Sequence, residues 1–337
     1  KANPDAAPPV ELTRPVKVTA AMDKLVLPPL EYFAAAEGEK PAIDASKLAA
    51  VGKVTLNQMA MKHVESGSVA SSDELVLNID GQTLEAVKTT VAGAFKFIDA
   101  KAPNQPATGK LDGKATLADL FDAKGMSIDA DVQISELPVA FIDAAQDLDG
   151  MALAALGERL SMRLITKMKQ GDGPLAVGIR SNNAKADLHG ELKNQTFMLT
   201  QPLVAELKVT DALGKKLLAK INPIFEGANS ADQPLRLTVL EKDLFIPLAD
   251  FNIADLKVPV AYLELGQMNQ ETKQYELGAI KLSTGNVLGG LVRMAQKFGA
   301  LGGRSSEQMT LKFTPVVVKL ENGRIDYLRR MDVLLDD

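Results

Sequence analysis

Apolar and polar residues alternate along most of this chain, and a two-residue period is typical of β-strands with one face toward a core and the other toward water. Residues 16–22 read VKVTAAM and residues 203–209 read LVAELKV. The same alternation occurs at residues 51–61, 68–79, 83–98, 109–117, 126–134, 160–168, 175–181, 184–193, 196–200, 235–240 and 275–282. We therefore predict a mainly β fold, because a mixed α/β chain of this length has far fewer strands.

The clearest turn lies near the C-terminus. Residues 310–320 and 324–335 both alternate, and the sequence Glu321-Asn322-Gly323 separates them. Asn-Gly suits the positive φ angles of a tight hairpin turn, so we predict a β-hairpin there.

Helices are expected to be few, short and amphipathic. Apolar residues recur at helical spacing in residues 138–157, 211–220 and 285–299, and the first of these segments contains Asp149-Gly150, where we expect a break. Each helix could cover an edge or one end of a sheet.

The chain shows no long internal linker. Residues 1–15 are rich in Pro and Ala at the start and are predicted to be the stub of a linker. Residues 16–337 are predicted to form one continuous β-rich body with a soft division near residue 170. No run approaches the roughly 18 apolar residues that a spanning helix requires.

Composition argues against several classes of function. Lys and Arg number 38 against 43 Asp and Glu, a net charge of −5, which disfavours nucleic acid as a partner. The chain has no Cys and two His, so disulfides, thiolate nucleophiles, most zinc sites and histidine-based triads are disfavoured. We expect no metal, no cofactor and no catalysis; a carboxylate hydrolase would need two converging acids, and the sequence identifies no such pair.

The apolar faces of the strands are aliphatic. The chain has no Trp and only 4% aromatic residues, so these faces consist mainly of Leu, Val, Ile, Ala and Met. Such a surface suits acyl chains and lacks the aromatic platforms of base-binding sites. An ordinary sandwich core has the same periodicity, so alternation does not distinguish a core from an open groove.

Segments spread over residues 130–337 resemble the AsmA-like superfamily of bacterial envelope proteins, which includes AsmA and TamB. They are ISELP at residues 134–138 with the helix to residue 157, residues 188–210, KINP at residues 220–223, and residues 313–326, which begin FTPVVVKL. Each motif is weak by itself, and their order along the chain carries the resemblance.

The resemblance implies a long antiparallel sheet curled into an apolar groove that holds phospholipid acyl chains. It also implies a non-catalytic role in lipid transport and outer-membrane biogenesis, in the periplasm, as a portion of an inner-membrane-anchored protein with envelope protein partners. The alternative is a closed β-sandwich that serves the envelope as an interaction or scaffold module without binding lipid.

Candidate groove residues follow the alternation in the strands that carry the resemblance best. Their neighbours Glu206 and Lys208 should face water, and an acidic residue at Leu207 or Leu199 should reduce bound lipid. The candidates are Leu188, Leu192, Phe197, Leu199, Leu203, Ala205, Leu207 and Val209.

Overall fold

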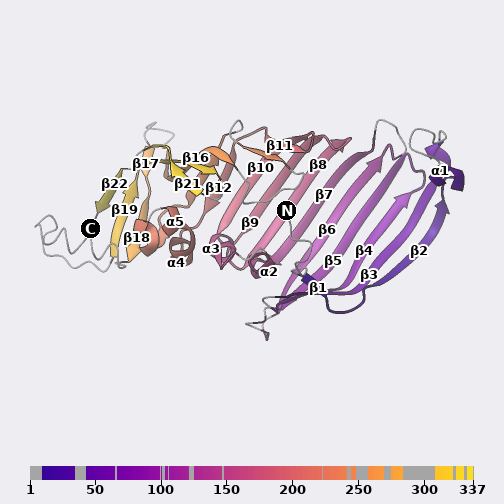
Figure 1. Ribbon diagram of the computed structural model, residues 1–337, viewed down its shortest axis with the longest axis horizontal. Coiled ribbons are helices and arrows are strands. Elements are labelled where there is room, and N and C mark those ends of the chain that lie inside the picture. Colours follow the sequence, from indigo (N-terminus) through magenta and orange to yellow (C-terminus); the bar gives the residue numbers. More distant parts are fainter. Residues whose placement is uncertain are drawn as a thin grey trace, which may run out of the picture. The chain divides into compact units, whose positions relative to one another are not determined.

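The computed structural model confirms the mainly β prediction: the fold has a large antiparallel sheet, which is not closed, and a few short helices (Figure 1). The structure describes residues 10–34, 43–64, 67–98, 100, 103–104, 106–120, 125–145, 148–221, 223–240, 244–247, 257–268, 275–283, 308–321, 324–329 and 332–336. The chain divides into two compact units. Unit 1 comprises Lys1–Asp147, Leu160–Val177 and Glu191–Gln195, and unit 2 comprises Leu148–Arg159, Gly178–Gly190 and Thr196–Asp337.

Unit 1 is built from long strands that follow one another in sequence and pair antiparallel with their neighbours. These are β2 (Lys17–Val26), β3 (Ala49–His63), β4 (Val69–Gly81), β5 (Ala86–Ile98), β6 (Ala107–Ala118) and β7 (Ser127–Pro138). The short strand β1 (Val10–Leu12), which falls within the segment predicted as a linker, pairs with the far end of β3. Because each pair joins consecutive strands, the sheet is a meander.

The register of these pairs separates apolar from polar side chains. Leu111 of β6 lies opposite Gly93 of β5 and Ile134 of β7, while the next residue, Asp112, lies opposite Ala92 and Gln133. Since alternate side chains point to opposite faces of a strand, one face of the sheet is apolar and the other is polar.

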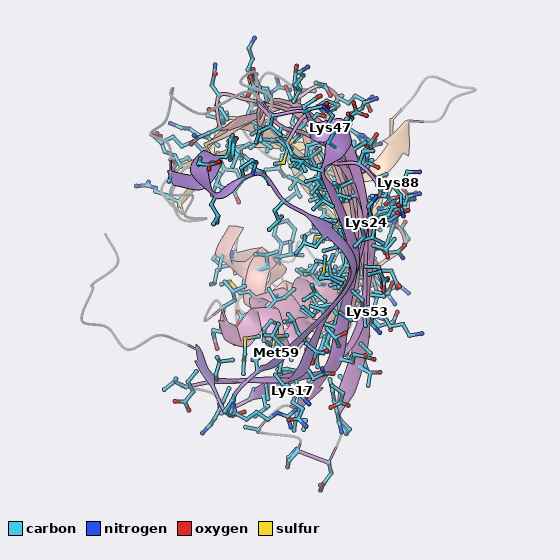
Figure 2. The ribbon with its side chains drawn as sticks, turned by 90° about the vertical axis from the view of Figure 1, so that its right-hand side faces the viewer. Lys17, Lys24, Lys47, Lys53, Met59 and Lys88 are labelled. Atoms are coloured by element: carbon cyan, nitrogen blue, oxygen red, sulfur yellow. The ribbon has the colours of Figure 1, made fainter. Side chains whose placement is uncertain are left out.

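The sheet of unit 1 is curved. Figure 2 shows its strands bending into an arc, with Lys53 and Lys88 on the convex side and Met59 on the concave side. Register shifts interrupt the β2–β3 and β4–β5 pairs, and Gln58 in β3 has a positive φ of 58°. Such β-bulges bend a strand and increase its twist, which accounts for much of the curvature.

A small cluster of buried apolar residues lies at one end of the strands. Leu48, Leu84 and Val87 are buried together, with partly buried apolar residues around them. Asp44 is the N-cap of the 3-10 turn η1 (Ala45–Lys47), and its side chain accepts a hydrogen bond from the Ser46 amide. The helix α1 (Leu30–Ala34) follows β2.

At the opposite end, α2 (Val139–Ala145) follows β7 directly. Its first residue, Val139, is fully buried, and Phe141 packs edge-on against Phe97 with ring centroids 5.7 Å apart. Unit 1 also contains β8 (Arg159–Lys169) from Leu160 onward and the first residues of β9 (Gly173–Ser181).

The predicted break in the first helical segment is confirmed. The second helix, α3 (Met151–Leu156), begins after Gly150, which serves as its N-cap with a φ of 79°, and Asp149 before it has a φ of 49°. Two successive residues in the left-handed region cannot continue a right-handed helix.

In unit 2, one series of strands pairs in the order β10, β12, β14, β16, β20 and β21, with β15 paired to β11 and β17 to β16. Their bounds are β10 (Ala184–Lys193), β11 (Thr196–Leu199), β12 (Leu203–Leu207), β14 (Leu235–Val239), β15 (Phe245–Pro247), β16 (Val258–Met268), β17 (Tyr275–Leu277), β20 (Val316–Glu321) and β21 (Arg324–Tyr327). A second sheet contains β13 (Ala228–Ala231), β18 (Ala279–Ser283), β19 (Gln308–Phe313) and β22 (Val333–Asp336).

The helix predicted at residues 211–220 is confirmed as a run of α4 (Asp211–Leu213), a π-helical turn η2 (Gly214–Leu218) and α5 (Ala219–Ile221), followed by the 3-10 turn η3 (Pro223–Gly227). Leu213, Leu218 and Phe225 are buried, and the Phe225 ring packs edge-on against Phe313 at 5.4 Å. This helical run therefore contributes to the core of unit 2.

Several details of unit 2 differ from the sequence prediction. The predicted strands at residues 275–282 and 324–335 are each divided, into β17 and β18 and into β21 and β22, which lie in different sheets. The predicted strand at residues 310–320 is two strands, β19 and β20, in different sheets, because Pro315 between them has no N–H for a ladder. The strand β16 was not predicted at all. The residues that flank the predicted hairpin turn support it, since Glu321 pairs with Arg324. The predicted helix at residues 285–299 lies outside the described residues. Within the described part of the chain, no helix is long and apolar enough to cross a membrane.

Candidate functional site

The concave face of unit 1 carries an apolar groove. We define the groove by its lining residues, which come from β3, β4, β5, β6, β7 and α2 and include a single hydroxyl group and no charged side chain: Met59, Met61, Ala70, Ser71, Phe95, Phe97, Leu111, Ile134, Leu137, Pro138 and Phe141. It encloses about 240 Å³. That volume lies just below the roughly 300–1,000 Å³ of typical ligand pockets, so it suits a segment of an acyl chain rather than a whole lipid.

Most of the groove side chains are half-buried. Met59, Met61, Phe95, Leu111 and Ile134 all retain partial exposure. Apolar side chains in a core usually lose nearly all their exposure, and contiguous half-exposed apolar surface often marks a binding site.

Glycines shape the floor of the groove. Phe95 of β5 lies directly opposite Gly109 of β6, and a Cβ on Gly109 would overlap ring atoms Cε2 and Cζ of Phe95. The aromatic ring thus lies over the backbone of the neighbouring strand, the cross-strand packing known as aromatic rescue of glycine. Gly113 is in a similar position next to Val91 and Val132. Large side chains beside glycines leave the concave face uneven and accessible.

The apolar face continues beyond the groove to β2. Val18 and Ala20 of β2 lie opposite Leu56 and Val54 of β3, and Val18 is 62% exposed. The concave face therefore remains apolar and open as far as the first long strand of unit 1.

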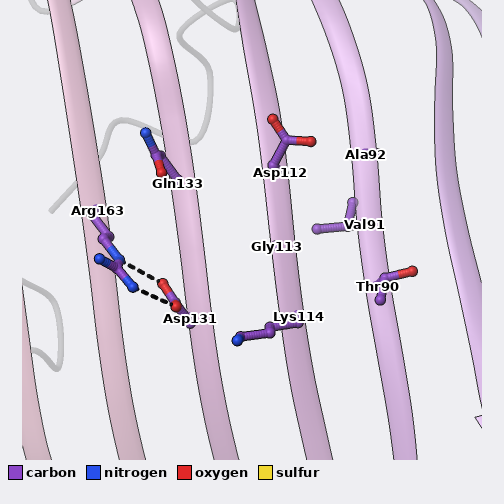
Figure 3. A pocket seen from close by; sticks show the side chains of 9 residues that line it. All are labelled: Thr90, Val91, Ala92, Asp112, Gly113, Lys114, Asp131, Gln133 and Arg163. Atoms are coloured by element: carbon purple, nitrogen blue, oxygen red, sulfur yellow. Dashed lines mark hydrogen bonds and ion pairs between the residues drawn. The ribbon is translucent and has the colours of Figure 1, made fainter.

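The convex face is polar and holds a shallow depression of about 340 Å³, shown in Figure 3. Arg163 of β8 donates two hydrogen bonds to the carboxylate of Asp131 in β7, at 2.8 Å from Nε and 2.7 Å from Nη2. The hydrogen bonds from Arg163 are the main reason that the pKa of Asp131 lies below its ordinary value, with a further contribution from the charge of Lys114. Both carboxylate oxygens of Asp131 are engaged by this pair, so the depression is explained as a cross-strand ion pair on a solvated face.

No metal site is evident in the part of the chain that the structure describes, where no group of three or more His, Asp or Glu side chains could hold an ion. His189 is an exposed residue of β10.

The eight groove residues predicted from the sequence lie in β10, β11, β12 and the segment after β12. Phe197, Leu199 and Val209 are buried, with exposed fractions of 2%, 5% and 3%. The remaining five are half-buried: Leu188, Leu192, Leu203, Ala205 and Leu207.

Register brings some of these residues onto one face of unit 2. Ala205 and Leu207 lie opposite Ala186 and Ala184 of β10, and Glu206 between them pairs with Lys185 at 3.9 Å on the other face. Phe197 is packed onto the sheet, because a Cβ on Gly190 would overlap its ring. Leu192 belongs to unit 1.

The groove residues of unit 1 were not among the predicted site residues. Their alternation was visible in residues 51–61, 83–98 and 109–117. The missing information was which apolar face stays open, since periodicity is the same for a covered and an uncovered face.

Comparison of the chain with family models, with curated proteins and with solved structures gives no match.

Proposed function

We propose that this protein is a non-catalytic lipid-handling protein whose apolar groove in unit 1 holds the acyl chains of phospholipids. The observation that carries the proposal is a half-exposed concave lining with no charged side chain, backed on the convex face by charged and polar residues. The resemblance to AsmA-like envelope proteins agrees with it. A periplasmic location within an inner-membrane-anchored protein, with envelope partners, belongs to the same proposal and rests on that resemblance.

The energetics suit a reversible carrier. Each methylene transferred from water contributes about 0.8 kcal/mol, so roughly eight methylenes would contribute about 6 kcal/mol before the cost of ordering the chain. A phospholipid headgroup requires no partner inside such a groove, because it can remain in water at the rim.

A matched pair of substitutions on β7 tests the proposal. Ile134 lines the groove, whereas its neighbour Gln133 is exposed on the convex face. Ile134→Asp places a carboxylate against acyl chains and should abolish phospholipid binding, while Gln133→Asp adds the same charge one residue away and should leave binding unchanged.

Bound lipid is measured by native mass spectrometry after a delipidating wash, with solvent extraction to identify the lipid. Circular dichroism and a urea titration establish that both variants are folded. The proposal fails if folded Ile134→Asp retains as much phospholipid as the original protein. A lipid-free mass that does not change when phospholipid is added would favour the alternative, an interaction or scaffold module.

A further inference from the structure

One edge of β2 has no partner strand among the described residues. The strand pairs with β3 on one side, and in Figure 1 it is the outermost strand of unit 1, with no described strand along its other side. All ten of its residues are exposed, including the apolar Val18 at 62% and Met22 at 37%. A strand edge of this kind presents a row of backbone N–H and C=O groups that can pair with another strand.

Only part of this edge is regular. The pairing with β3 shifts between Met22 and Lys24, so Asp23 is an extra residue at a β-bulge, and Pro15 and Pro28 flank the strand. Bulges and prolines limit edge pairing. The stretch Lys17–Met22 that remains has six residues, the length of a typical strand.

We propose that β2 pairs antiparallel with the β2 of a second copy of this chain, about a two-fold axis that passes through Ala20. In this register Val18 lies opposite Met22 of the other copy on the apolar face. Lys17 lies near Asp23, the residue that follows the regular stretch in the other copy, so opposite charges meet at each end of the pair. Neither Lys17 nor Asp23 has an ion-pair partner within the described part of a single chain. The strand is therefore complementary to itself in polarity and charge.

Neighbouring registers are less favourable. An axis through Thr19 would place Val18 opposite Ala20 and Lys17 opposite Ala21. An axis through Ala21 would place Met22 opposite Ala20 and would leave Val18 opposite residues beyond the β-bulge. Only the axis through Ala20 sets the two large apolar side chains, Val18 and Met22, opposite each other, and such cross-strand pairs stabilise a sheet.

The symmetry has a consequence for the groove. A two-fold axis perpendicular to the sheet leaves the apolar faces of both copies on the same side, and the two concave faces join across the paired β2 strands. The pairing itself does not depend on lipid binding, so the two proposals succeed or fail separately.

A single cysteine tests the axis, because the chain has none of its own. Residues directly opposite in an antiparallel pair have Cα atoms about 4.5–5.5 Å apart, within disulfide range. Ala20→Cys should therefore give a disulfide-linked dimer under mild oxidation. Val18→Cys is the matched control: the two copies of residue 18 would be four residues apart along the strands, about 13 Å, and should not cross-link.

Charge exchange tests the register in variants that carry no introduced cysteine. Lys17→Asp places two acids near each other at both ends of the pair and should raise the dimer dissociation constant about tenfold in analytical ultracentrifugation. The double variant Lys17→Asp/Asp23→Lys restores opposite charges and should restore the original constant.

Three results would overturn the proposal: a monomeric protein at every concentration tested, equal cross-linking by Val18→Cys and Ala20→Cys, or no recovery in the double variant. Phospholipid content of Lys17→Asp is measured in parallel. A monomer that retains its lipid leaves the groove proposal intact, and a lipid-free dimer leaves the pairing intact.

Discussion

The contact between Gly109 and Phe95 predicts how the groove responds to one added methyl group. Gly109 is buried in β6, between β5 and β7, and its backbone is covered by the Phe95 ring. In Gly109→Ala the new Cβ would overlap two ring atoms and would lie 2.9 Å from the carbonyl oxygen of Ser135. The two flanking strands hold β6 in place, so the ring must turn away from Gly109 into the groove.

The expected cost follows from this geometry. Adding a carbon to a well-packed site typically costs about 1–3 kcal/mol in the free energy of unfolding, and here one contact is with backbone, which cannot rotate away. The displaced ring also occupies part of a groove of only about 240 Å³. We therefore expect Gly109→Ala to lower the urea midpoint and to reduce the amount of bound phospholipid.

Two quantities are measured for each variant. Stability is obtained from urea unfolding monitored by circular dichroism, and lipid content is obtained by native mass spectrometry. Phe95→Leu removes the ring atoms that the methyl group would strike, so the double variant Gly109→Ala/Phe95→Leu should be less destabilised than the two single changes added together. Additive effects in the double variant, or a Gly109→Ala protein with unchanged stability and lipid content, would show that the added methyl group does not displace the Phe95 ring.

Two further predictions concern α2 and the convex face. Phe97→Ala removes a ring that is 4% exposed and packs on Phe141, and should cost about 3–5 kcal/mol and increase proteolysis within α2 in limited digestion. Hydrogen bonds from Arg163 hold the folded-state pKa of Asp131 below the ordinary value of an aspartate, so the pair stabilises the fold above that ordinary value and loses its effect as the pH falls through the lowered pKa. Asp131→Asn should thus lower the urea midpoint slightly at neutral pH, and the variant and the original protein should have the same midpoint below the lowered pKa of Asp131. A difference of equal size at every pH would contradict this prediction.

Much of the fold could be predicted from local patterns. Alternation identified β3 to β7, because a strand with one wet face and one apolar face must repeat every two residues. The interruption at Asp149-Gly150 was equally local, since two residues with positive φ end a helix wherever they occur. The strand β16 was missed because Pro259 lies within it; the structure accommodates the proline at a register shift between Val258 and Ala261.

The site was much less predictable. Phe197 and Phe95 have similar surroundings in sequence, each within an alternating strand. In the structure Phe197 is buried at 2% exposure, whereas Phe95 is half-buried and lines the groove. What differs is which strands and helices cover each ring, and those partners are distant in sequence.

Local sequence patterns therefore specify antiparallel strands with one apolar face, because strand periodicity and turn chemistry act between residues a few positions apart. Tertiary contacts alone leave the apolar face of unit 1 open as a groove and leave one edge of β2 without a partner strand among the described residues. Both outcomes depend on long-range register and on β-bulges such as those in the β2–β3 and β4–β5 pairs, which curve the sheet.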